Sequence, residues 1–182
     1  MNDIWHKMGD IWKPGNVANQ QPLLCAGIFA FGASPQGWYF VQENARYEFP
    51  YKIYGHTDDI VKRVKAAWAA SPSNLGVLLN GIKGTGKTIS AQLLANWAVD
   101  NNLPVLVVRD PIPLAEVLEA VKQDIVIIFD EFEKTHAKKE DQQNLLSTID
   151  GMSRHQRRRL LIFTANHKSL DENFVDRPRR IR

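Results

Sequence analysis

The chain of 182 residues is long enough for one α/β domain, or for one domain with a small appendage. Its 44% hydrophobic and 24% charged residues are ordinary globular usage, which excludes a wholly disordered or collagen-like chain. The net charge of +3 (23 Lys and Arg minus 20 Asp and Glu) is too small to indicate a nucleic-acid-binding protein by itself.

The cysteine content and the longest apolar run both indicate a cytoplasmic protein. A single cysteine, Cys25, excludes an internal disulfide and suits a reducing compartment. The longest apolar run, residues 23–31, is too short to span a bilayer. It follows an Asn- and Gln-rich segment rather than the basic flank of a secretory signal. We therefore expect no membrane segment.

Residues 1–55 are expected to form an N-terminal arm and a small β extension. Alternating apolar residues and a turn at 34–37 predict an antiparallel sheet with strands at about 23–31, 38–43 and 46–53. Pro50 should lie at an edge of this sheet because it cannot donate to a ladder. The first 20 residues are expected to be a loosely held arm. The aromatic residues of this segment either pack the small sheet against the core or present a surface to a partner.

Residues 56–182 predict an α/β fold with a parallel sheet covered by helices on both faces. Four continuous apolar runs, at 76–79, 105–108, 125–129 and 160–163, are typical of strands buried on both sides. Segments with helical spacing lie before and between them, and Thr57 is the expected cap of the first helix. The expected inner faces are, in chain order, Ile60, Val64 and Trp68; Ile89, Leu93 and Trp97; Leu114, Val117, Leu118 and Val121; and Leu145, Leu146 and Ile149.

A phosphate-binding loop follows the first of these strands. Residues 81–88, GIKGTGKT, match the pattern G-x-x-x-x-G-K-[ST] of a P-loop. Its glycines allow consecutive backbone N–H groups to turn inward, and the next helix directs its positive end at the same point. Lys87 would reach the β- and γ-phosphates, and Thr88 would bind Mg²⁺. The expected nucleotide-binding residues are Gly81, Ile82, Lys83, Gly84, Thr85, Gly86, Lys87, Thr88 and Ile89.

Two acidic residues end the third apolar run. Asp130 would complete the Mg²⁺ site opposite the loop, and Glu131 would deprotonate the water that attacks the γ-phosphate. The alternative is that the two acidic residues only begin a solvated helix. The fourth run ends in Asn166, whose amide either holds the attacking water or caps a turn.

Two arginine-rich segments complete the chain. Arginines at 177–182 can stabilise transition-state charge at a phosphate site, or they can be a solvated surface. The block at 154–159 is either a solvated loop or subunit contact, or a contact to a nucleic-acid backbone.

Residues 53–182 resemble the AAA+ ATPase family, and within it the AAA-type remodelling ATPases. The residues that carry the resemblance are the loop at 81–88 with its strand (Walker A), residues 127–131 (Walker B), the Leu-rich segment ending in Asp-Gly at 150–151, Asn166 (sensor 1) and residues 174–180 (the arginine-finger segment). The resemblance implies that Arg177 and Arg180 reach into a neighbouring subunit's site. It also implies that Tyr54 and Gly55 contact adenine.

The resemblance further implies ATP and ADP as ligands with Mg²⁺, a homo-oligomeric ring of six subunits, and remodelling of a protein client. The helical lid of the family, with its sensor-2 arginine, is not in the chain, so either the sequence is a piece of a longer protein or the lid is missing. Two other functions stay open. One is a DNA-acting ATPase of the helicase-loader or replication type, and the other is a nucleotide-gated assembly module with little turnover.

Overall fold

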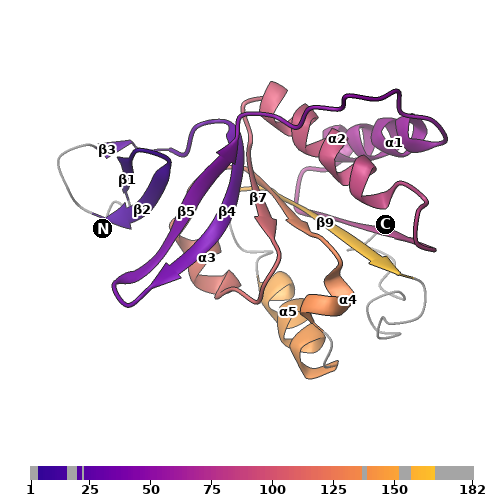
Figure 1. Ribbon diagram of the computed structural model, residues 1–182. Coiled ribbons are helices and arrows are strands. Elements are labelled where there is room, and N and C mark those ends of the chain that lie inside the picture. The colour runs from indigo at the N-terminus through magenta and orange to yellow at the C-terminus, as the bar shows by residue number, and fades with distance from the viewer. Residues whose placement is uncertain (1–3, 16–19, 22, 137–138, 152–156, 167–182) are drawn as a thin grey trace.

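The computed structural model describes residues 4–15, 20–21, 23–136, 139–151 and 157–166. They form one nine-stranded sheet with helices on both faces (Figure 1). The strands are β1 (Ile4–Met8), β2 (Ile11–Gly15), β3 (Gln20–Gln21), β4 (Gly27–Ser34), β5 (Gly37–Asn44), β6 (Leu75–Gly81), β7 (Pro104–Val108), β8 (Ile125–Phe129) and β9 (Arg159–Asn166). The helices are α1 (Thr57–Ala70), α2 (Lys87–Asp100), α3 (Leu114–Ala120), α4 (Phe132–Thr135) and α5 (Lys139–Gly151).

The strand order is β3-β1-β2-β5-β4-β7-β8-β9-β6. From β4 to β6 in that order, each strand is parallel to its neighbour. The N-terminal strands β1, β2, β3 and β5 pair antiparallel. This arrangement confirms the expected fold class, a parallel sheet with an antiparallel N-terminal extension. It also places β9 between β6 and β8, that is, between the phosphate loop and the acidic pair.

Each central strand is buried on both faces, which explains the continuous apolar runs in the sequence. In β7, Val105 and Val107 pack with α1 and α2, whereas Leu106 and Val108 face the opposite core. That opposite core contains residues of α3, α4 and α5 and the N-terminal aromatic residues. No helix among the described residues is both long enough and apolar enough to cross a membrane.

The helices lie where the sequence predicts them, but two details are wrong. Thr57 is the first residue of α1 rather than its cap, and His56 precedes it without a capping side-chain hydrogen bond. In α2 the buried residues are Ser90, Ala91, Leu94, Ala95, Asn96 and Ala98, whereas the larger expected residues Ile89, Leu93 and Trp97 are only partly buried. Small side chains let the helix backbone pack close to the sheet. The expected inner face of α3 is confirmed.

The expected loosely held arm is wrong for residues 4–15. These residues form β1 and β2, and β2 pairs with β5. Trp5 and Trp12 are 1% and 2% exposed, and Trp5 stacks on Phe40 at 5.2 Å. Burial of two tryptophans holds this hairpin on the sheet because each removes a large apolar area from water.

The predicted strand at 46–53 is absent, and this segment instead crosses α2 as an extended strap. The side-chain amide of Asn96 takes the place of a ladder partner. Its Oδ1 accepts from the Tyr47 N–H at 2.8 Å, and its Nδ2 donates to the Tyr47 carbonyl at 2.9 Å. Arg46 pairs with Asp100 at 2.6 Å nearby. Pro50 therefore lies in the strap rather than at a sheet edge.

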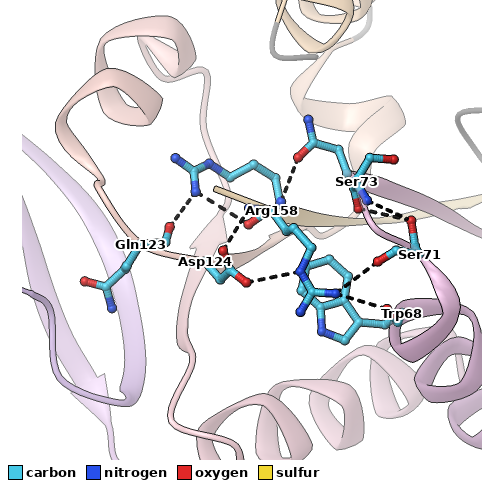
Figure 2. A network of polar contacts seen from close by, with 8 residues as sticks. Trp68, Ser71, Ser73, Gln123, Asp124 and Arg158 are labelled. Carbon is cyan, nitrogen blue, oxygen red and sulfur yellow. Dashed lines mark hydrogen bonds and ion pairs between the residues drawn. The ribbon is translucent and has the colours of Figure 1, made fainter. Parts of the chain in front are cut away.

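The end of the basic block at 154–159 is built into the protein interior at the start of β9 (Figure 2). Arg158 pairs with Asp124 at 3.2 Å, donates to the Ser71 carbonyl at 3.0 Å and stacks on Trp68 at 4.1 Å. Arg159 is 2% exposed. Arg157 is exposed to solvent, whereas the Arg158 side chain is 34% exposed.

Arg159 closes the C-terminal end of α3. Its guanidinium donates to the Val121 carbonyl at 2.7 Å, to the Leu118 carbonyl at 3.3 Å and to the Gln123 carbonyl. Carbonyls at the end of a helix lack N–H partners in the following turn, and the arginine supplies donors at this point. Burial lowers the pKa of Arg159 to about 10, because removal from water disfavours the charged form.

Replacing Arg159 by Met should therefore lower the free energy of unfolding by about 2–4 kcal/mol, because several buried carbonyls lose their donor. In a domain of this size the midpoint of thermal unfolding should fall by roughly 5–15 °C. The exposed neighbour gives a matched control, and Arg157→Met should change the midpoint by no more than about 2 °C. Equal midpoints for the two variants would contradict the structural role of Arg159.

Candidate functional site

The phosphate loop runs from the end of β6 into the start of α2. Gly84 and Gly86 have φ values of +86° and +83°, a left-handed conformation that glycine adopts at low cost. The Thr85 hydroxyl donates to the Ile82 carbonyl at 2.9 Å and braces the loop. The backbone therefore has the form that the glycine spacing predicts, with the N-terminus of a 14-residue helix at its end.

Lys87 is held by three acceptors at the carboxyl end of the sheet. Its Nζ donates to the carbonyls of Gly81 and Ile82, each at 2.8 Å, and to Asn166 Oδ1 at 3.1 Å. An ammonium group has three N–H donors, so all of them are engaged. The contact with Asn166 follows from the strand register, in which Gly81 of β6 pairs with Asn166 of β9.

Asp130 lies where the sequence predicts it, beside the start of α2. Its Oδ1 accepts from the Thr88 hydroxyl at 3.3 Å and from the Thr164 hydroxyl at 2.7 Å. The two expected metal ligands, Thr88 and Asp130, are thus brought together. Thr164 is a member of this site that the sequence analysis missed. Its position two residues before Asn166, on the same face of β9, is the signal that could have indicated it.

The oxygen ligands of Thr88 and Asp130 suit Mg²⁺ better than a metal whose ligands all come from protein side chains. The described residues contain no group of three or more His, Cys, Asp or Glu that could hold a metal ion. Mg²⁺ is commonly held by one or two protein oxygens, with phosphate oxygens and water completing its octahedron. One hydroxyl and one carboxylate oxygen at this point fit that pattern.

Glu131 directly precedes α4 and has a left-handed backbone conformation, with φ 48° and ψ 48°. Its N–H donates to the Thr164 hydroxyl at 2.9 Å, which fixes the turn after Asp130. Its side chain is 52% exposed and pairs with Lys134 at 2.7 Å. The hydrogen bond to Glu131 raises the pKa of Lys134. Such conformations are rare for residues other than glycine and occur often at functional sites.

Asn166 joins the loop to a second carboxylate. Its Nδ2 donates to Glu133 Oε1 at 2.5 Å, while its Oδ1 accepts from Lys87. The other carboxylate oxygen, Glu133 Oε2, is buried without a hydrogen-bond partner in the described part of the chain. Glu133 is the second residue that the sequence analysis missed.

Lys87, Thr88, Glu131, Glu133 and Asn166 line one cavity of about 300 Å³. Its walls come from the loop and α2 on one side and from Glu131, Glu133 and the end of β9 on the other. A larger cavity of about 680 Å³ lies along α1 and β6 and reaches the loop at Gly81, Thr85 and Lys87. The expected loop and acidic residues therefore meet at one place on the sheet.

The expected adenine contacts, Tyr54 and Gly55, line neither of these cavities. Tyr54 is 78% exposed, and the Lys52 ammonium lies over its ring at 5.5 Å. Gly55 lies next to it, just before α1. Arg177 and Arg180 lie outside the described residues.

One N-terminal strand contributes a charged side chain near the acidic pair. Arg109, which follows β7, forms a bidentate ion pair with Glu43 of β5. Its two terminal nitrogens donate to the two carboxylate oxygens at 2.7 and 3.0 Å. These hydrogen bonds raise the pKa of Arg109, with a smaller contribution from Asp130. The strands outside the loop motif thus contribute to the electrostatics near the acidic pair.

Comparisons with known proteins point to nucleotide chemistry. A family model described as novel STAND NTPase 3 (nSTAND3) matches residues 61–179. No curated protein matches the chain. Among solved structures, PCH-2 of C. elegans is similar with a TM-score of 0.44 and 21% identity, over 69% of this chain and 40% of that chain. This chain thus spans about two fifths of the PCH-2 chain.

His136 is a buried histidine at the end of α4, the helix that follows the turn at Asp130 and Glu131 (the acidic turn). His136 stacks on Phe132 at 4.6 Å, and its Nδ1 lies 2.9 Å from the Thr135 hydroxyl. Burial lowers the pKa of His136 below its ordinary value of 6.5, because the charged form loses hydration.

The free energy of unfolding should fall as the pH decreases from about 7 to 5, because the unfolded chain then protonates a histidine that the folded protein keeps neutral. His136→Phe retains the aromatic stack and removes the titrating group, so it should flatten this dependence in urea unfolding. His56, whose side chain is 95% exposed, supplies the control, and His56→Gln should leave the slope as in the unmodified protein. An unchanged slope in His136→Phe would contradict this prediction.

Proposed function

The chain belongs to the novel STAND NTPase 3 family, and we propose that it binds and hydrolyses ATP at the loop of residues 81–88. The family confirms the expected nucleotide-hydrolysing NTPase, whereas the finer assignment to the AAA-type remodelling ATPases stays a prediction. One observation carries the proposal. Lys87, Glu131 and Asn166 border the same cavity, and Asp130 bonds to Thr88 at its edge.

Binding of a triphosphate would exchange partners at Lys87. Its ammonium now bonds to two loop carbonyls and to Asn166, and the β- and γ-phosphate oxygens would replace some of these neutral acceptors. Thr88 and Asp130 would hold Mg²⁺, which offsets the charge of the phosphates when bound. We propose that residues 56–182 form the nucleotide-binding core.

Hydrolysis would use the acidic turn. Asn166 would hold a water molecule in line with the γ-phosphorus, and Glu131 would take its proton. The water oxygen bonds to the γ-phosphorus while the bond from that phosphorus to the β–γ bridging oxygen breaks, so ADP and phosphate form. To act in this way, Glu131 must first break its ion pair with Lys134.

The same ion pair favours a second candidate, a nucleotide-gated assembly module with little turnover. If Glu131 keeps its contact with Lys134 when ATP is bound, the nucleotide is held but only slowly hydrolysed. Turnover by the unmodified protein that does not exceed that of Glu131→Gln, with ATP still bound, would select this candidate.

For the partner, we propose a homo-oligomeric ring in the cytoplasm that acts on a protein client. The DNA-acting alternative rests on the basic block at 154–159. The structure gives it less support, because Arg158 and Arg159 of that block donate hydrogen bonds to backbone carbonyls of the protein itself. Arg177 and Arg180 would complete the site of the neighbouring subunit, which makes turnover a property of the interface.

Lys87→Ala should raise the Kd for Mg·ATP roughly 10–100-fold, because one charge-assisted contact to phosphate is lost. Isothermal titration calorimetry measures this directly. Lys62 on the exposed side of α1 gives a matched control, and Lys62→Ala should leave the Kd unchanged. The proposed function would be wrong if Lys87→Ala altered neither affinity nor turnover.

Mixing two inactive variants tests the shared site. Glu131→Gln and Arg177→Ala should each lose turnover, and an equimolar mixture should recover part of it, because some interfaces then combine an intact Glu131 with an intact Arg177. The phosphate release rate per subunit should also fall on dilution of the unmodified protein. No recovery together with a rate independent of concentration would exclude catalysis across an interface.

A further inference from the structure

Glu133 is a second carboxylate at the cavity, two residues after the proposed base. Its side chain is only partly accessible, whereas that of Glu131 is 52% exposed and paired with Lys134. Both glutamates line the cavity together with Thr88 and the end of β9. Given the hydrolysis proposed above, on which this inference rests, we propose that Glu133 orients Asn166 with one oxygen and holds the attacking water with the other.

The first part of this role follows from hydrogen-bond donors and acceptors. Lys87 can only donate and an ionised Glu133 can only accept, so an amide between them has one orientation that satisfies both. In that orientation Asn166 Oδ1 faces Lys87 and Nδ2 faces Glu133, as the distances of 3.1 and 2.5 Å indicate. Without Glu133, the amide could turn over and present its NH₂ group to the ammonium.

The second part follows from the buried oxygen that has no partner. Glu133 Oε2 has no hydrogen-bond donor in the described part of the chain, although burial of a carboxylate oxygen normally requires one. Phosphate oxygens of a nucleotide carry no proton at the site and cannot supply it. The cavity of about 300 Å³ beside it has room for water and offers polar partners at Thr88, Thr164 and Asn166. Water is therefore the donor that fits this place.

A water bound there would lie between the phosphate loop and the acidic turn. The loop residues Gly84, Gly86 and Lys87 form the opposite wall of the same cavity. A water that donates one O–H to Glu133 keeps its lone pairs free for the γ-phosphorus, and its other proton is available to Glu131. Glu133 thus fixes the nucleophile, while Glu131 receives the proton.

Glu133→Gln tests this division of roles in the full chain. The glutamine oxygen can still accept from Asn166, but the NH₂ group in place of Oε2 can no longer accept from water. We expect kcat for ATP to fall about 100-fold with KM within about twofold of the unmodified protein. Glu119, an exposed glutamate of α3, gives the matched control, and Glu119→Gln should leave both constants unchanged.

Binding of ADP with aluminium fluoride adds a readout that a merely structural role would not move. This complex imitates the transferring phosphoryl group together with its attacking water. Glu133→Gln should weaken the complex at least about tenfold, while ADP alone binds as tightly as before.

The outcomes separate this inference from the proposed function. No turnover by the unmodified protein would overturn the proposed function and this inference with it. Turnover that Glu133→Gln leaves intact would overturn only the inference. A fall in kcat accompanied by an equal loss of ADP affinity and a lowered unfolding midpoint would indicate a structural role and would likewise overturn it.

Discussion

The site depends on the pairing register of three parallel strands. Gly81 of β6 lies beside Asn166 of β9, and Phe129 of β8 lies beside Phe163 of β9. Since successive residues of a strand point to opposite faces, a shift by one residue would turn Asn166 and its neighbours away from the loop. Burial of β8 and β9 on both faces fixes this register. The contact between Lys87 and Asn166 is therefore a consequence of core packing.

The sequence predicts the parts of the protein that local patterns control. The four apolar runs become β6 to β9 because residues that face two cores cannot alternate with polar ones. The loop follows from the glycines at 84 and 86, whose left-handed conformation few other residues adopt. The inner face of α2 differs from the prediction because its buried apolar residues are Ala91, Leu94, Ala95 and Ala98, whereas Leu93 and Trp97 pack only partly buried against the same core.

The parts that could not be predicted depend on contacts between residues far apart in the sequence. The segment at 46–53 alternates like a strand, yet the amide of Asn96, 49 residues later than Tyr47, supplies its hydrogen bonds. Glu133 and Thr164 have no motif of their own, and their roles become visible only when β8 and β9 lie side by side. Likewise, Arg159 is part of a basic block in the sequence, whereas in the structure its side chain donates to a carbonyl at the end of α3.

The strained turn at Glu131 is stabilised from the core behind it. Phe132, the next residue, is fully buried and packs against Phe163 at 5.2 Å, while Phe129 stacks on Phe163 at 4.8 Å. The aromatic cluster continues into the N-terminal strands through Trp12, which lies in the same core. A left-handed residue other than glycine persists only where the surrounding structure enforces it. The N-terminal strands therefore belong to the structural support of the acidic turn, since their aromatic residues fill the core on which that turn rests.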